Sequence, residues 1–273
     1  MTPRPTRLVL LGHPVAHSLS PTFQNAALQA AGIPLTYEAR DVASHDLAAV
    51  LRALTHEGAA GNVTAPHKAA VAACCARLTP IAQRVGAVNT FWVEDGALVG
   101  DNTDVEGFHN AVVQLRGAAP AHATVAVLGA GGAAGAAVAA IAGWEGCTAR
   151  VWNRTAERAR ALCARFPGVA IVVDSAIDAV AGAALVVHAT TVGVAQDAMP
   201  IDPSLLPRGA DVMDLVYRPG ETLWVRAARD RGHRAADGLP MLIEQGALAF
   251  ERWFGQVPNR AAMWAAMWAA VGR

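Results

Sequence analysis

The sequence predicts an α/β protein of two domains, and three observations carry that prediction. Short apolar runs alternate with helical patterns along most of the 273 residues, as in proteins built on parallel sheets. A glycine-rich turn at residues 129–134 follows one apolar run and precedes a helical pattern. The length suits about two domains. Acidic and basic residues balance at 22 each, so we expect no nucleic-acid-binding or membrane-binding basic surface.

In the first half of the chain, apolar runs predict strands at residues 7–11, 37–40, 61–63, 87–92 and 98–100. Asp95-Gly96 is a turn signal between the last two. Ser20, followed by Pro21, is expected to cap a helix that runs to about residue 31. Ser44 is expected to cap a second helix, and further helices are expected from about residues 67, 80 and 104.

In the second half, strands are predicted at 124–128, 148–152, 170–173, 185–189 and 212–215. Helices are predicted at 133–144, 155–165, 240–254 and 260–271, with Thr155 as a cap. The segment 117–120 is expected to be a hinge or linker before the second unit. Met and Trp at spacing i, i+4 between residues 263 and 268 favour a packing face, with a partner-helix site as the alternative.

No Asp, Glu, Lys or Arg occurs from residue 121 to 144, so a membrane-spanning helix has to be considered. Glycines interrupt that stretch, and a strand, a turn and a buried helix explain it better. The four cysteines have neither disulfide nor zinc spacing, and His13 and His17 lack a third ligand, so no metal site is predicted. The cysteine pattern favours the cytoplasm.

Lys68 is the only lysine in the chain, and the other 21 of the 22 basic residues are arginine. Lysine can release its proton inside a protein, whereas arginine cannot. Lys68 is therefore a candidate for proton transfer. The alternative is a lysine retained by chance on a solvated helix, and the polar residues Asn62 and Thr64 just before it favour the functional reading.

The glycine-rich turn, Gly129-Ala130-Gly131-Gly132-Ala133-Ala134, matches the dinucleotide-binding pattern in its required place between strand and helix. Glycine permits the tight turn and the close approach of backbone to pyrophosphate, and the helix N-terminus attracts phosphate. The next predicted strand ends in Asn153-Arg154-Thr155, where an NAD site would usually have an acid. We therefore expect Arg154 to bind a 2′-phosphate and the cofactor to be NADP. The alternative places Arg154 on an arginine-rich helix surface.

Four polar clusters fall at strand ends or helix starts of the first domain, where a parallel sheet gathers its ligand-binding residues. They are Ser18 with Ser20, Asn62 with Thr64 and Lys68, Asn89 with Thr90, and residues 101–104. Together they supply hydroxyls, amides, one amine and a carboxylate, which suit a small polyol acid. Singly, Ser20, Asn89 and Asp104 could be only cap or turn residues.

These motifs, in this order, resemble the shikimate dehydrogenase family. The resemblance rests on residues 12–21, 62–68, 86–90, 102–104, 129–133, 153–155, 214–219 and 241–245, and it extends over essentially the whole chain. It implies a substrate domain at 1–104 completed by helices at 240–273, a Rossmann NADP-binding domain at 105–239, and a cleft between them. It implies the reversible NADP-dependent reduction of 3-dehydroshikimate to shikimate, in aromatic amino acid and chorismate biosynthesis, by a monomer or homodimer.

The resemblance also implies residue roles. Lys68 and Asp104 would be the catalytic pair. Substrate-binding residues would be Ser18, Ser20, Asn62, Thr64, Lys68, Asn89, Asp104, Tyr217 and Gln245. Cofactor-binding residues would be Gly129, Ala130, Gly131, Gly132, Ala133, Asn153, Arg154, Thr155, Leu215 and Gly238. His67 and His188 receive no role.

Two departures from the family pattern stand out: no polar or basic residue follows the glycine-rich turn, and Pro240 stands where many relatives have glycine. Lys68 is expected to act as general acid in the reduction, because an adjacent carboxylate opposes the lowering of its pKa that a base would need. Two alternatives remain open. One is a quinate/shikimate dehydrogenase of broader range, and the other is a protein that binds NADP(H) without catalysis.

Overall fold

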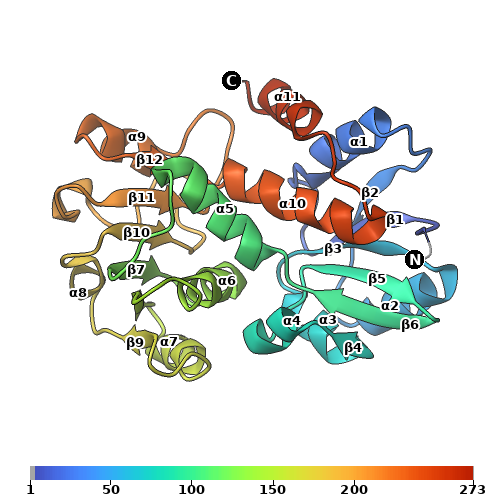
Figure 1. The fold of residues 1–273 in the computed structure, drawn as a ribbon, viewed down its shortest axis with the longest axis horizontal. Helices are drawn as coiled ribbons and strands as arrows, with labels where there is room; N and C mark the ends of the chain where they lie inside the picture. Colours follow the sequence, from blue (N-terminus) through green and yellow to red (C-terminus); the bar gives the residue numbers. More distant parts are fainter. Residues whose placement is uncertain (1–3, 273) are drawn as a thin grey trace. The chain divides into compact units, whose positions relative to one another are not determined.

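The computed structural model describes residues 4–272, which form two compact units (Figure 1). Unit 1 contains the residues up to Thr103 together with those from Ile243 onward, and unit 2 is Asp104–Leu242. The domain limits expected from the sequence remain a prediction. Their ends at residues 1–3 and 273 lie outside the described residues.

The described part of unit 1 has a six-stranded sheet flanked by helices. Its strands are β1 (Leu8–Gly12), β2 (Tyr37–Asp41), β3 (Ala60–Val63), β4 (Arg77–Leu78), β5 (Thr90–Glu94) and β6 (Ala97–Asp101). Its helices are α1 (Ser20–Ala30), α2 (Leu47–Glu57), α3 (Lys68–Cys74), α4 (Pro80–Val85) and α11 (Arg260–Val271), together with most of α10 (Leu239–Phe254).

The strand order of this sheet is β2-β1-β3-β5-β6-β4. Every neighbouring pair is parallel except those that include β5, which runs antiparallel to β3 and β6. The reversal follows from the two-residue turn at Asp95 and Gly96, whose φ angles of 52° and 73° are those of a tight hairpin. The sheet is therefore mainly parallel, with the carboxyl ends of β1, β3 and β6 at one edge.

Burial on one face of α2 follows the apolar spacing expected from the sequence. The buried residues of this helix are Leu47, Val50, Leu51 and Leu54. They belong to a core that includes Phe91 and Leu98 from the sheet. The expected caps were wrong. Leu19 rather than Ser20 precedes α1, and α2 begins after Asp46 rather than Ser44, in both cases without a side-chain cap bond. Tertiary packing of the apolar face sets these starts more strongly than capping propensity.

The described part of unit 2 is a second six-stranded sheet with helices on both faces. Its strands are β7 (Thr124–Leu128), β8 (Thr148–Trp152), β9 (Ala170–Val172), β10 (Leu185–His188), β11 (Asp211–Asp214) and β12 (Ala235–Ala236). Its helices are α5 (Asp104–Arg116), α6 (Gly132–Ile141), α7 (Ala156–Cys163), α8 (Ala176–Val180) and α9 (Leu223–Asp230), with a 3₁₀ turn, η1, at Pro203–Leu205.

All neighbouring strands of this sheet are parallel, in the order β12-β11-β10-β7-β8-β9. This is the doubly wound dinucleotide-binding order, and it reverses between β7 and β10. Ala126, Leu128 and Val212 face one core with α8 and α9, while α6 packs on β7 and β8 and against α5 (Figure 1). The loops after β7 and β10 therefore flank the point at which such sheets bind ligands.

Two expectations about the connections need correction. The segment 117–120 does not open the second unit, because α5 precedes it and already belongs to unit 2, where it packs on α6. The helix after the glycine-rich turn ends at Ile141 rather than at 144. Along residues 4–272, none of the helices has the length and apolar character that crossing a membrane requires.

Candidate functional site

The loop that carries Ser18 is held at the carboxyl end of β1. The backbone N–H of Ser20 donates to Ser18 Oγ at 3.2 Å. Asp41, at the end of β2, accepts from the Val15 backbone N–H at 3.2 Å and lies 2.5 Å from His13 Nδ1. The hydrogen bond from His13 lowers the pKa of the Asp41 carboxyl. Ser18 therefore lies in a turn, called the serine turn below, that is tied to β2, and Ser20 follows it at the start of α1.

Thr64 follows β3 and lies against the same loop. A Cβ added to Gly12 would be 2.5 Å from Thr64 Cγ2, so only glycine allows this approach. The His13 backbone N–H donates to the Ala65 carbonyl at 3.1 Å. The ends of β1 and β3, which pair in the sheet, thus bring Thr64 close to the serine turn.

Asn62 is buried in β3, and its amide is engaged by protein groups. The Tyr37 hydroxyl donates to Asn62 Oδ1 at 2.8 Å, and Asn62 Nδ2 donates to the Asn89 carbonyl at 3.1 Å. Burial raises the pKa of Tyr37 well above its ordinary value, so its hydroxyl stays protonated and acts as a donor. This geometry gives Asn62 a positioning role toward Asn89.

Asn89 connects three segments that are far apart in the sequence. Its Oδ1 accepts from the Thr103 backbone N–H at 2.7 Å, and its Nδ2 lies 3.0 Å from Thr103 Oγ1 and 3.1 Å from Gln245 Oε1. All three residues are buried. The residues expected to bind ring hydroxyls, Asn89 and Gln245, are therefore neighbours.

The position of Gln245 depends on how α10 is fixed in unit 1. A Cβ on Gly246 would be 2.3 Å from Phe23 Cε2, and the Gly246 carbonyl accepts from Gln24 Nε2 at 2.9 Å. Two turns further along, Arg252 Nε donates to Asp101 Oδ2 at 2.9 Å. Helix α10 is thus fastened to α1 on one side and to the end of β6 on the other.

Lys68 and Asp104 each begin a helix. Lys68 is half-buried at the start of α3, and its carbonyl accepts from the Val88 backbone N–H at 2.9 Å. Asp104 is 5% exposed at the start of α5, directly after Thr103. Lys68 belongs to unit 1, whereas Asp104 is the first residue of unit 2. The expected catalytic pair therefore takes one residue from each unit and stays a prediction.

The glycine-rich turn fits a dinucleotide. Gly129 has φ +132°, and a Cβ there would be 2.6 Å from the Ala189 carbonyl oxygen. Gly131 is exposed and has open space where a Cβ would be. It precedes α6 without a side-chain cap bond. The first N–H groups of a ten-residue helix are therefore free to receive phosphate.

The residues after β8 lie on the surface. Asn153 Nδ2 donates to the Thr155 carbonyl at 2.9 Å, which shapes the turn before α7. Thr155 is the N-cap residue of α7, as expected, although its side chain makes no cap hydrogen bond. Arg154 is exposed, and among residues 4–272 its guanidinium has no ion pair or hydrogen-bond partner. An uncommitted guanidinium at this place suits a phosphate.

Leu215 and Gly238 meet through backbone contact. A Cβ on Gly238 would be 2.5 Å from the Leu215 carbonyl oxygen, and the Gly238 N–H donates to the Val216 carbonyl at 3.0 Å. Both lie beyond the carboxyl edge of the second sheet, Leu215 directly after β11. Tyr217 is half-buried in the same loop. The structure therefore brings Leu215 and Gly238 together.

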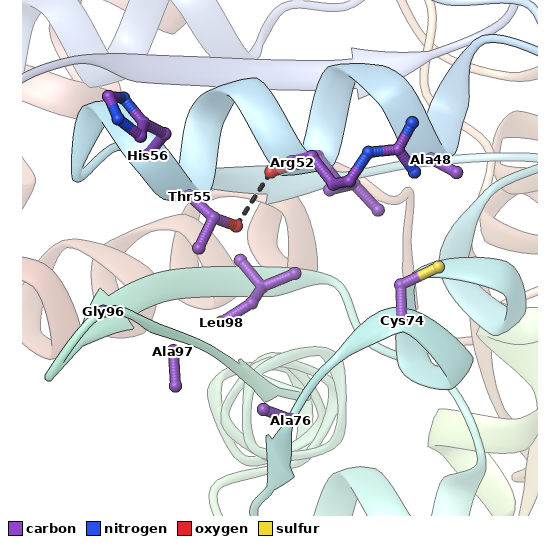
Figure 2. Close-up of a pocket in the computed structure, with 10 residues that line it drawn as sticks. Ala48, Arg52, Thr55, His56, Cys74, Ala76, Gly96, Ala97 and Leu98 are labelled. Atoms are coloured by element: carbon purple, nitrogen blue, oxygen red, sulfur yellow. Dashed lines mark hydrogen bonds between the residues drawn. The ribbon is translucent and has the colours of Figure 1, made fainter.

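A separate pocket of about 820 Å³ lies between α2 and the β5–β6 hairpin (Figure 2). Arg52, His56 and the exposed Cys74 are polar residues at its wall, and no expected site residue lines it.

Burial raises the pKa of the Cys75 thiol to about 12, and the neighbouring Cys74 adds to this shift. Within the described chain, no three His, Cys, Asp or Glu side chains are placed to hold a metal ion.

Comparison with known proteins decides the family. Residues 10–91 match the shikimate dehydrogenase substrate-binding domain, and residues 238–267 match the shikimate 5′-dehydrogenase C-terminal domain. The chain is 44% identical over 263 residues to a shikimate dehydrogenase (NADP⁺) of Methylobacterium radiotolerans, with 93% of each protein covered. The chain belongs to the shikimate dehydrogenase family.

Solved structures agree with this membership. The crystal structure of shikimate 5-dehydrogenase from Thermus thermophilus in complex with NADP(H) and shikimate is 40% identical, with a TM-score of 0.88 over 97% of this chain and 99% of that one. A quinate dehydrogenase from Corynebacterium glutamicum in complex with NAD is 30% identical, with a TM-score of 0.88 over 96% and 98%.

The sequence analysis did not predict several residues that position the candidate site residues. Tyr37 holds Asn62, and Arg252 holds the end of β6, but neither lies near a motif in the sequence. Thr103 lies inside the motif at residues 102–104, so its contact with Asn89 could have been predicted from the sequence. Distant pairing of this kind leaves no local pattern in one sequence.

Proposed function

We propose that this protein catalyses the reversible NADP-dependent reduction of 3-dehydroshikimate to shikimate. The supporting observation is membership of the shikimate dehydrogenase family along almost the whole chain. The buried Asn89–Thr103–Gln245 network adds oriented amides and hydroxyls of the kind that a polyol acid needs. The reaction class is an oxidoreductase acting on a secondary alcohol.

The proposed chemistry uses few groups of this chain. When bound, NADPH supplies the hydride. As the substrate carbonyl becomes an alcohol, negative charge grows on its oxygen. Lys68 Nζ stabilises this charge and donates the proton, while the Asp104 carboxylate accepts a hydrogen bond from the same hydroxyl and orients the amine. Ser18 and Ser20 hold the substrate carboxylate through their hydroxyls. Thr64, Asn89, Tyr217 and Gln245 contact the ring, with Asn62 holding Asn89.

The cofactor would bind in unit 2. Gly129, Ala130, Gly131, Gly132 and Ala133 receive the pyrophosphate through backbone N–H groups. Arg154, with Asn153 and Thr155 shaping its turn, binds the 2′-phosphate, and Leu215 and Gly238 lie at the nicotinamide end. The absence of an acid at the end of β8 favours NADP over NAD.

A spectrophotometric assay tests this function. Purified protein is offered shikimate and quinate, each with NADP and with NAD, and the absorbance of the reduced cofactor is followed. We expect the highest kcat/KM for shikimate with NADP. A higher value for quinate would support the second candidate, which the similarity to a quinate dehydrogenase favours. Absence of turnover in all four mixtures, with NADPH still bound, would indicate a protein that binds the dinucleotide without catalysis.

We further propose that the protein works in the cytoplasm as a monomer or homodimer. The four cysteines are all free thiols, as a reducing compartment requires. Light scattering during size-exclusion chromatography measures the mass against 28.2 kDa for one chain.

A further inference from the structure

A chain of buried and half-buried polar groups lies at the carboxyl edge of the second sheet. His188 is the last residue of β10 and is 0% exposed. Its Nδ1 lies 2.8 Å from Asp214 Oδ1 at the end of β11, and its Nε2 lies 2.5 Å from Thr190 Oγ1. The remaining Asp214 oxygen accepts from the Thr222 hydroxyl at 2.7 Å. Both ends of the imidazole are thus occupied.

The hydrogen bonds can be assigned from donor and acceptor chemistry. A carboxylate only accepts, so His188 Nδ1 donates to Asp214. Thr190 Oγ1 accepts from the Val192 backbone N–H at 3.2 Å. Its hydroxyl proton is then available to donate to Nε2 of a neutral imidazole. In that tautomer His188 orients the Thr190 side chain, and Thr190 in turn orients the segment that follows β10.

That segment forms one wall of the glycine-rich turn. A Cβ on Gly129 would be 2.6 Å from the Ala189 carbonyl oxygen and 3.2 Å from Thr190 Cγ2. Strands β7 and β10 are neighbours, with Leu128 paired to His188. The residues that His188 orients are therefore those against which Gly129 is packed.

We propose that His188 is a positioning residue for dinucleotide binding: it holds Thr190 against Gly129 and so fixes the shape of the pyrophosphate turn. This inference rests on the proposed binding of NADP at that turn. The link concerns the pyrophosphate turn and not Arg154, so its loss weakens NADPH and NADH by the same factor. Most residues proposed to hold the ring acid lie in unit 1, with Asp104 and Tyr217 as the exceptions, so we expect the KM of shikimate to stay near the wild-type value.

The test compares His188→Leu, Thr190→Val and the double variant. Dissociation constants of NADPH and NADH are measured by the fluorescence of the reduced nicotinamide, and the KM of shikimate by steady-state assay. We expect each single variant to weaken both dinucleotides about 5- to 20-fold, as for one lost oriented hydrogen bond. The double variant is expected to bind no more weakly than the weaker single variant, because both substitutions remove the same His188–Thr190 hydrogen bond.

Val225→Ala is the matched control. Val225 is 0% exposed in α9, within the core beside this network, and its side chain makes no polar contact. Its backbone N–H, which donates to Thr222 Oγ1 at 3.3 Å, is kept in the alanine variant. The melting temperature of Val225→Ala should fall, while its dissociation constants for NADPH and NADH should stay at the wild-type values. Equal affinity loss in this control would mean that general destabilisation explains the His188 result, and the proposal would be overturned.

Other outcomes separate this inference from the proposed function. Gly131→Asp places a carboxylate at the exposed turn and should abolish binding of both dinucleotides. Normal binding in Gly131→Asp would refute the proposed cofactor site itself. If Gly131→Asp loses binding while folded Thr190→Val binds both cofactors like the wild type, only the His188 inference fails. Multiplicative losses in the double variant would also overturn it. Should His188→Leu fail to fold, Thr190→Val alone decides, because valine nearly preserves the shape of threonine.

Discussion

At the scale of single residues, two cations stand apart from the rest of the chain. Lys68 is the only basic side chain, histidine aside, that can exchange a proton under ordinary conditions. Arg154 is exposed at the end of β8 without a partner among residues 4–272. Other arginines, such as Arg116 and Arg234 on Asp211, are engaged in ion pairs. These two are the side chains whose substitution is expected to change chemistry and cofactor choice.

Lys68→Arg tests proton transfer directly. The guanidinium keeps the positive charge but does not release its proton, so we expect most turnover to be lost while shikimate still binds. Steady-state kinetics gives kcat, and equilibrium titration gives the affinity. Near-normal kcat would mean that only charge matters at this position.

Arg154→Ala tests cofactor discrimination. We expect NADPH binding to weaken by about 1.5–3 kcal/mol, the contribution of a charged hydrogen-bonded contact, and NADH binding to be unchanged. Fluorescence titration of both cofactors measures this. Arg160→Ala, on the next helix and already paired with Glu157, is the control and should change neither affinity. Equal losses for the two cofactors would refute the 2′-phosphate role.

At the scale of elements, the site depends on loops and helices fixed by contacts between strand ends. The serine turn after β1 is tied to β2 through Asp41, and α10 is tied to α1 through Gly246. The residues joined by each of these contacts are far apart in the sequence and close in space. Loosening one should change substrate affinity before it abolishes the fold.

Gly246→Ala introduces a methyl group where the buried ring of Phe23 leaves no room. The helix has to shift, at a cost of about 1–3 kcal/mol, and carries Gln245 away from Asn89. We expect a higher KM for shikimate and an unchanged affinity for NADPH. Ala249→Gly in the same helix is the control, because it lowers stability through helix propensity without moving Gln245. If the KM for shikimate rose in Ala249→Gly but not in Gly246→Ala, this explanation would be contradicted.

Asp41 should make the serine turn sensitive to acid. Its pKa is lowered in the folded protein, chiefly by the His13 hydrogen bond, so its stabilising contribution is present above the ordinary value of 3.8. That contribution is lost as the pH falls through the lower folded value. Asp41→Asn should therefore unfold at lower urea concentration than the wild type at pH 7 and pH 5, with a smaller difference at pH 3. A difference independent of pH would show that this ionisation does not contribute.

At the scale of the whole molecule, the chain leaves unit 1 at Thr103 and returns to it within α10, at Ile243. The returning segment completes the first core. Trp253 is buried and donates to Thr90 Oγ1 at 3.1 Å, and Met263 and Met267 are buried in α11, which packs on α1. The stability of unit 1 therefore depends on residues from both ends of the sequence.

A chain that ends at residue 242 tests this dependence. We expect it to lose cooperative unfolding of unit 1, because the partners of Asn89, Thr90 and Asp101 are removed together. Circular dichroism during heating and shikimate titration measure the loss. Retention of shikimate binding in the shortened chain would contradict it.

Local patterns predicted the parts of the fold that local physics governs. The glycine-rich turn, the buried face of α2 and the Asp95-Gly96 hairpin follow from backbone freedom and apolar spacing within a few residues. The caps at Ser20 and Ser44 failed, because packing of the whole helix decides where it begins. The roles of the individual site residues remain predictions.

The sequence by itself determined the α/β class, the dinucleotide turn and the family, because each is written in short ordered motifs. Only the tertiary structure placed Asn89 beside Thr103 and Gln245, and His188 between Asp214 and Thr190. Such contacts join segments that are far apart in the sequence, and no local sequence pattern shows which segments will meet. They arise when parallel strands end at one edge of a sheet and packing brings those ends within hydrogen-bonding distance.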